Sequence, residues 1–194
     1  MYKVIKQSIL KKKIKLGLLG DSNVGKTSII FSFLSFKFRE KMISLILDKL
    51  ETKFISNDGE EKKLILLDNG GAEKFHSIAI KNIKNVDGII LVFDITSRTS
   101  FENLSFWIDS ITKLSKNPFI VLFGNKIDRE KSDWKLTKEE LNKFSEENNI
   151  KYLGVSAKTK KGIDEGFNYI ANKVLENNEN ECIIIKARKK RYIK

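Results

Sequence analysis

Residues 20–27 carry the sequence Gly20-Asp21-Ser22-Asn23-Val24-Gly25-Lys26-Thr27. This octet fits the Walker A pattern, a glycine-rich loop whose backbone N–H groups point inward and cradle a polyphosphate. The apolar run at 14–20 predicts a strand before the loop, and apolar residues at helical spacing after Lys26 predict a helix behind it. The N-terminus of that helix adds its dipole to the anion site. We therefore expect Lys26 to neutralise the β- and γ-phosphates and the Thr27 hydroxyl to ligate Mg²⁺.

Around this loop, apolar runs typical of strands alternate with helical patterns. Further strands are expected at 50–57, 63–68, 88–94, 119–124 and 150–155. Further helices are expected over 99–114, from 137 and over 163–174. Because Asn57-Asp58-Gly59 favours a tight hairpin, the strands on either side of it should be antiparallel. The alternation predicts an α/β protein with the P-loop NTPase fold, in which three α/β/α layers contain a six-stranded, mostly parallel sheet with one antiparallel strand and about five helices.

Two of the expected helices begin with the signature of a capping box. Thr99 is followed three residues later by Glu102, and Thr137 is followed by Glu140. In such pairs the Thr side chain accepts a hydrogen bond from the backbone of the first turn, and the Glu side chain accepts one in return. We expect both helices to be capped at these threonines.

The composition favours one soluble, cytoplasmic domain that is a monomer. The chain has 194 residues, of which 41% are apolar and 32% are charged, and it contains a single Cys. This length suits one core, and a single Cys excludes an internal disulfide framework and fits a reducing compartment. Apolar runs are too short to cross a bilayer, and the first 13 residues lack the apolar stretch of a signal peptide.

The formal net charge of +12 is concentrated at the two ends of the chain. Residues 1–13 carry five bases and no acid, and residues 186–194 carry six bases and no acid, so the rest is nearly neutral. This distribution predicts a basic extension over 1–13, a folded domain over 14–175 and a flexible basic tail over 176–194. The chemistry of the protein should therefore reside in the neutral part.

The tail mixes apolar residues with cations, a composition that fits weak contact with an anionic membrane surface. Nucleic acid, a nuclear-import receptor and a solvated disordered end are alternatives, of which nucleic acid is disfavoured. Twelve residues follow Cys182, and Tyr2 rather than Gly follows the initiator Met, so neither prenylation nor N-myristoylation is expected.

A second motif, Asn125-Lys126-Ile127-Asp128, directly follows the apolar strand that ends at Gly124. A carboxylate can accept two hydrogen bonds from the N1–H and the 2-amino group of guanine, whereas adenine offers no such pair of donors. Asp128 would therefore select guanine as the base.

The two motifs occur together with Gly88-Ile-Ile-Leu-Val-Phe-Asp94, a helical segment at 100–108 and Ser156-Ala157-Lys158. This combination resembles the Ras-superfamily small GTPases, and most of all their Rab branch, over roughly residues 13–175. The resemblance implies a protein that binds GTP and GDP with Mg²⁺, hydrolyses GTP, and acts in vesicle trafficking or signalling through protein partners that the sequence does not specify.

The resemblance also implies roles for individual residues. The Ala157 N–H would bind guanine O6, the stems of Lys126 and Lys158 would sandwich the base, Ser156 would brace this loop, and Phe38 would place an aromatic ring against the nucleotide. The full set of expected nucleotide-binding residues is Ser22, Asn23, Val24, Gly25, Lys26, Thr27, Ser28, Phe38, Asp68, Gly71, Asn125, Lys126, Asp128, Ser156, Ala157 and Lys158.

One departure from the family pattern concerns hydrolysis. The family motif Asp-x-Ala-Gly-Gln-Glu is here Asp68-Asn-Gly-Gly71-Ala72-Glu73. By resemblance, Asp68 would hold Mg²⁺ through water, and Gly71 would join Lys26 as a candidate catalytic residue by directing its N–H at the γ-phosphate. The position whose Gln orients the attacking water is Ala72, whose methyl group cannot do so. We therefore expect slow hydrolysis.

A second departure lies 18 residues after Thr27, where the family places a Thr that binds Mg²⁺ and this chain has Leu45. Ser44 would serve only if the loop shifted by one residue. The apolar run at 42–47 is either a partner-binding surface or part of the core. The alternative to a slow GTPase is a non-hydrolysing, nucleotide-binding interaction module.

Overall fold

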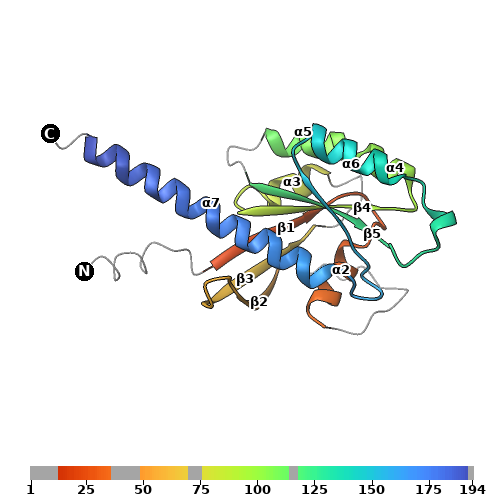
Figure 1. The fold of residues 1–194 in the computed structure, drawn as a ribbon, viewed down its shortest axis with the longest axis horizontal. Helices are drawn as coiled ribbons and strands as arrows, with labels where there is room; N and C mark the ends of the chain where they lie inside the picture. The colour runs from red at the N-terminus through yellow and green to blue at the C-terminus, as the bar shows by residue number, and fades with distance from the viewer. Residues whose placement is uncertain (1–12, 36–48, 70–75, 114–117, 192–194) are drawn as a thin grey trace.

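The computed structural model describes residues 13–35, 49–69, 76–113 and 118–191. Their six strands form one sheet in the order β2-β3-β1-β4-β5-β6 (Figure 1). The strands are β1 (Lys13–Leu19), β2 (Leu50–Ile55), β3 (Glu61–Asp68), β4 (Gly88–Asp94), β5 (Phe119–Asn125) and β6 (Lys151–Gly154). Only the β2–β3 pair in this part of the chain is antiparallel, and the turn between these two strands contains Gly59 with φ 77°. The predicted sheet, including its hairpin, is confirmed.

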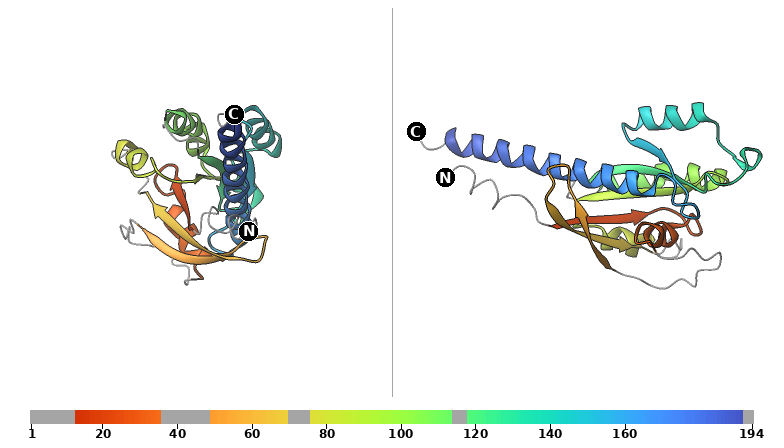
Figure 2. Two further views of the ribbon diagram at one scale, coloured as in Figure 1. Left: turned by 90° about the vertical axis from the view of Figure 1, so that its left-hand side faces the viewer. Right: turned by 60° about the horizontal axis from the view of Figure 1, so that its bottom comes forward.

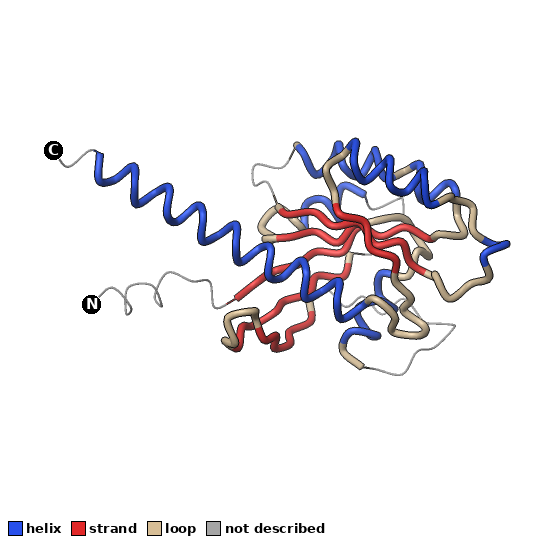
Figure 3. The backbone as a smooth tube through the Cα atoms, in the orientation of Figure 1, coloured by secondary structure: helices blue, strands red, loops and turns tan. Residues whose placement is uncertain are grey.

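Helices cover both faces of this sheet, as the tube view shows (Figure 3). The helices are α2 (Lys26–Phe33), α3 (His76–Asn82), α4 (Arg98–Glu102), α5 (Leu104–Thr112), α6 (Lys138–Glu147) and α7 (Ile163–Arg191), with a short 3₁₀ turn at Lys131–Asp133. One apolar cluster joins α2 and α7 to one face, and a second joins α3, α5 and α6 to the other. This is the predicted three-layer α/β/α arrangement.

The parallel strands bring several polar residues to a common edge of the sheet. In the strand register Leu18 of β1 lies beside Asp68 of β3, and Asp94 of β4 lies beside Asn125 of β5. Because parallel strands end at the same edge, these side chains lie next to the loop that follows β1. The fold therefore places the candidate site at the carboxyl ends of the strands.

The helix expected over 99–114 is interrupted and begins earlier than predicted. Asn103, with φ −70° and ψ −9°, separates α4 from α5. The cap of α4 is Ser97, whose side chain accepts a hydrogen bond from the Ser100 backbone N–H, so the capping box predicted at Thr99 is wrong. The physical reason is that the helical backbone already begins at Arg98, which leaves Thr99 inside the first turn. The second predicted capping box, at Thr137 and Glu140, is confirmed with both of its hydrogen bonds.

The last helix is longer than predicted. The helix predicted over 163–174 continues, as α7, to Arg191 and projects beyond the sheet (Figure 2). Residues 167–191 contain neither Gly nor Pro, so no helix-breaking residue interrupts the backbone after the apolar face has left the core. The predicted domain boundary at 175 remains a prediction. Among the described residues, no helix is both long and apolar enough to span a membrane.

We expect Ser97→Ala to lower the free energy of unfolding by about 1 kcal/mol, because it removes the side-chain cap of α4. Thr99→Ala is the matched control, since Thr99 is exposed and follows the cap by two residues, and it should change stability by less than about 0.5 kcal/mol. Urea unfolding of both variants measures the difference. Equal effects would show that the capping assignment is wrong.

Candidate functional site

The loop between β1 and α2 makes two close approaches that require glycine. Gly20 has φ 132°, and a Cβ there would lie 2.0 Å from the Val92 carbonyl oxygen. Gly25 has φ 99°, and a Cβ there would lie 2.3 Å from Asn125 Nδ2. The glycines of the Walker A pattern therefore let the loop lie tightly against β4 and β5.

Lys26 begins α2 with its side chain folded back over this loop. Its Nζ donates to the carbonyl oxygens of Gly20, at 3.0 Å, and Asp21, at 2.6 Å, and only 6% of the residue is exposed. Burial lowers the pKa of Lys26 from its ordinary value to about 8, against the opposing effect of the carboxylates of Asp68 and Asp21. The ammonium thus lies in the loop with neutral acceptors as its direct partners, an arrangement suited to an anionic ligand.

Thr27 and Asp68 meet beside Lys26. Thr27 Oγ1 donates to Asp68 Oδ2 at 2.5 Å. Asp68 Oδ1 is buried and has no hydrogen-bond partner among the described residues, and burial raises the pKa of this carboxyl group. A buried carboxylate oxygen without a partner, next to a hydroxyl, fits the predicted site for a hydrated divalent cation. Thr27 and Asp68 are the residues that would hold Mg²⁺ there, and the ion would supply positive charge for phosphoryl transfer.

Asn125 joins the Walker A loop to the loop after β6. Its Nδ2 donates to the Val24 carbonyl oxygen at 2.8 Å, and its Oδ1 accepts from the Ala157 backbone N–H at 3.1 Å. Only 2% of Asn125 is exposed. One amide therefore fixes the relative position of two loops that lie far apart in the sequence.

Lys126 is held in an unusual backbone conformation beside Asn125. It has φ 70°, and its Nζ contacts the Asn23 carbonyl oxygen at 3.0 Å and Asp94 Oδ2 at 2.5 Å. Asp94 also accepts hydrogen bonds from the backbone and hydroxyl of Thr96. Asp94 is a site residue outside the predicted set, and its place at the end of the predicted strand 88–94 is the signal that could have found it.

Asp128 is oriented by the loop that contains Ser156. Ser156 Oγ donates to Asp128 Oδ1 at 2.6 Å and accepts from the Thr159 backbone N–H at 3.1 Å. Ser156 is fully buried, whereas Asp128 and Lys158 are exposed. The buried Ser156 therefore fixes the Asp128 carboxylate, which remains accessible to a ligand from the solvent.

The structure brings most of the predicted site residues to this one edge of the sheet. Ser22 and Asn23 are exposed in the loop, and Ser28 lies half-buried in the first turn of α2. Four predicted positions lie outside the described residues: Phe38, Leu45, Gly71 and Ala72.

A comparison with protein families matches residues 15–176 to the model of the Ras family. The chain belongs to the Ras family. It is 38% identical over 162 residues to the Ras-related protein Rab-13 of Mesocricetus auratus, which covers 83% of this chain and 79% of the relative. It is 33% identical to the GTP-binding protein ypt2 of Schizosaccharomyces pombe, with 83% and 80% covered, and 30% identical to the Ras-related protein Rab-18 of Lymnaea stagnalis, with 84% and 81% covered. These relatives confirm the resemblance to the Rab branch.

This Ras-family domain contains a second set of contacts to the Walker A loop that the sequence did not predict. The carboxylate of Asp21 accepts hydrogen bonds from Asn103 and Trp107. Trp107 belongs to the predicted helical segment at 100–108, and no sequence motif assigns a role to Asp21 or Asn103. A separation of more than 80 residues leaves no local pattern that could have revealed the contact.

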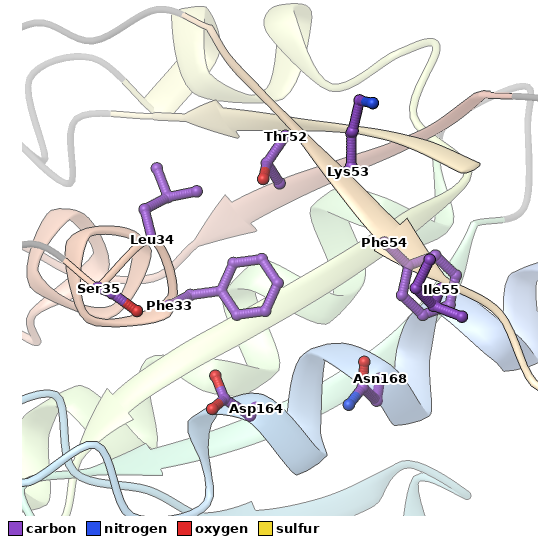
Figure 4. Close-up of a pocket in the computed structure, with 9 residues that line it drawn as sticks. All are labelled: Phe33, Leu34, Ser35, Thr52, Lys53, Phe54, Ile55, Asp164 and Asn168. Carbon is purple, nitrogen blue, oxygen red and sulfur yellow. The ribbon is translucent and has the colours of Figure 1, made fainter. Parts of the chain in front are cut away.

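A pocket of about 540 Å³ lies away from these residues, between the end of α2, β2 and the start of α7 (Figure 4). Phe33, whose ring stacks on Phe167 with centroids 4.0 Å apart, and Phe54 line its apolar part. Ile55 on its rim is 61% exposed. None of the predicted nucleotide-binding residues that the structure describes lines this pocket.

We expect Asn125→Ala to lower the free energy of unfolding by about 3 kcal/mol, because it leaves the Val24 carbonyl and the Ala157 N–H buried without partners. Asn172→Ala is the matched control. Asn172 also makes two side-chain hydrogen bonds, to Asn57 and Asn168, but at exposed positions, so its loss should cost about 1 kcal/mol or less.

Urea unfolding of both variants, after bound ligands have been removed, measures these costs without a contribution from ligand binding. Similar losses in the two variants would contradict the role of Asn125 as the joint between the loops.

Proposed function

We propose that this Ras-family protein is a Rab-like GTPase that binds GTP and GDP with Mg²⁺ and hydrolyses GTP slowly. The observation that carries the proposal is the joint made by Asn125, because it couples a phosphate-binding loop to a base-binding loop. A polyphosphate on the first loop and a guanine on the second would occupy one continuous edge of the sheet. Family membership and the name of the relative ypt2, a GTP-binding protein, support the same ligand.

Each part of the nucleotide has a proposed partner. Backbone N–H groups from Ser22 to Ser28 would surround the phosphates, and Lys26 would exchange its carbonyl partners for phosphate oxygens. Thr27 would bind Mg²⁺ directly and Asp68 would bind it through water. These groups supply positioning and charge, which are the main needs of phosphoryl transfer.

The base would lie between Lys126 and Lys158. Asp128, braced by Ser156, would accept from the guanine N1–H and 2-amino groups, and the Ala157 N–H, which donates to Asn125 Oδ1 in the structure, would be shared with guanine O6. Phe38, outside the described residues, would lie against the nucleotide. An adenine nucleotide would leave Asp128 without its two donors, so the proposed site discriminates between the bases.

The proposal of slow hydrolysis depends on two positions outside the described residues. Ala72 has no group that can hold a water molecule, and Leu45 has no oxygen for Mg²⁺. Gly71 retains a backbone N–H for the γ-phosphate, so stabilisation of charge by Gly71 and Lys26 would remain while orientation of water would be lost. The alternative is a module in which bound nucleotide stabilises the fold and is not hydrolysed.

We expect Ala72→Gln to raise the single-turnover rate of GTP hydrolysis at least about tenfold, because the amide can orient the attacking water. Ala72→Leu is the size-matched control without a polar group, and it should leave the slow rate unchanged. A normal rate in the unmodified protein that Ala72→Gln does not alter would contradict the proposal. Tight GTP binding without turnover in both proteins would favour the non-hydrolysing module.

We further propose a role in vesicle trafficking, at the surface of an anionic membrane. The relatives belong to the Rab branch, which supports the process. The start of β1 and the far end of α7 lie at the same end of the molecule (Figures 1 and 2), so the basic segments that adjoin them can contact one surface together. The Walker A loop follows the opposite end of β1 and would face away from that surface.

We expect the protein to sediment with vesicles of phosphatidylcholine and phosphatidylserine, and not to sediment with vesicles of phosphatidylcholine alone. Replacing Lys189, Lys190 and Arg191 by Gln should weaken binding about a hundredfold, at about 1 kcal/mol for each cation. The control replaces three exposed bases of the body, Lys138, Lys143 and Lys161, by Gln and should have little effect. Equal weakening by both triple variants, or binding to neutral vesicles, would contradict the proposal.

A further inference from the structure

The carboxylate of Asp21 is clamped by two donors from a distant part of the chain. Asp21 Oδ1 accepts from Trp107 Nε1 at 2.9 Å, and Asp21 Oδ2 accepts from Asn103 Nδ2 at 2.7 Å. These donors lie 86 and 82 residues away from Asp21 in the sequence. Both carboxylate oxygens thus have a defined partner.

The two donors are themselves fixed by packing. Trp107 is 1% exposed and belongs to the apolar cluster between the sheet and α5. Asn103 lies at the interruption between α4 and α5, where it is both the C-cap of α4 and the N-cap of α5. The position of the Asp21 side chain is therefore set by how these helices pack on the sheet.

The backbone of the same residue serves the Walker A loop. The Asp21 carbonyl oxygen accepts from Lys26 Nζ at 2.6 Å, which is shorter than the 3.0 Å hydrogen bond from the same ammonium group to the Gly20 carbonyl oxygen. A shift of Asp21 would therefore move an acceptor of Lys26 and the neighbouring N–H groups of the loop. Preformed donor geometry is what allows such a loop to bind phosphate without an ordering cost.

We propose that Asp21 is a positioning residue for nucleotide binding, held by Asn103 and Trp107 so that the Walker A loop keeps its phosphate-binding shape. The inference rests on the proposed binding of guanine nucleotide at this loop. A carboxylate in a phosphate-binding loop would repel the ligand if it could turn toward it. The two donors prevent this by holding the carboxylate toward α5 and by offsetting part of its charge.

The test compares rates of guanine-nucleotide release. Asn103→Ala removes one donor without removing core volume, and it should accelerate release of a fluorescent GDP about tenfold, the effect of losing one hydrogen bond to a charged group. Asn148→Ala is the matched control, because Asn148 caps the end of α6 as Asn103 caps the end of α4, and its side-chain amide donates to the Phe144 carbonyl oxygen within its own helix. The control should leave the release rate unchanged.

Substitutions of Asp21 separate its position from its charge. Asp21→Ala should accelerate release at least as much as Asn103→Ala, and adding Asn103→Ala to it should have no further effect. Asp21→Asn should release GDP at a rate within about threefold of that of the unmodified protein. The amide oxygen of Asn at this position can still accept from Trp107, and the Asn103 amide can turn so that its oxygen accepts from the new amide nitrogen. Melting temperatures of all variants identify any that fail to fold. Because Asn103→Ala leaves the core intact, its release rate tests the inference even if an Asp21 variant does not fold.

Two results would overturn the inference. Equal release rates for Asn103→Ala and Asn148→Ala would show that the contact does not act on the nucleotide. Release from Asp21→Asn as fast as release from Asp21→Ala would show that the charge of Asp21 matters and its position does not. Absence of guanine-nucleotide binding by the unmodified protein would instead overturn the proposed function, and this inference with it.

Discussion

The amide of Asn125 is the contact on which the arrangement of the site depends. Three loops must converge where the parallel strands end, and none of them has regular structure to hold it. Asn125 is the last residue of β5, so its side chain is placed by the sheet and can hold the Walker A loop with one end and the loop after β6 with the other. Close approach of Gly25 to this amide explains why a side chain cannot be accommodated there.

Around that joint, two charged groups, Lys26 and Asp68, have neutral groups as their hydrogen-bond partners. Lys26 is a buried cation whose hydrogen bonds go to carbonyl oxygens, and Asp68 keeps one oxygen buried without a partner in the described part of the chain. Such groups cost stability in isolation, since buried charges need close partners of opposite sign. Their arrangement agrees with the proposed ligand, which would bring both phosphate oxygens and a cation into the same space.

Much of this could be predicted from the sequence, for identifiable physical reasons. The Walker A loop, the individual strands, the hairpin at Gly59 and the cap at Thr137 all depend on local patterns within a few residues. The contact of Trp107 with Asp21 could not be predicted, because an apolar periodicity marks Trp107 as buried but does not show what its N–H meets. The extension of α7 was missed because amphipathic spacing detects packing on a core, and α7 continues beyond its last described core residue, Leu175.

That extension fixes a distance. The 29 residues of α7 rise about 44 Å along one axis. An irregular chain of equal length would let its far end approach the domain from many directions, whereas a continuous helix holds that end on a single line and at a single rotation. Whatever contacts the last turns of α7 is therefore presented with the domain in a defined orientation. The helix therefore sets the orientation of the domain relative to a partner bound at its last turns, whatever the affinity of that contact.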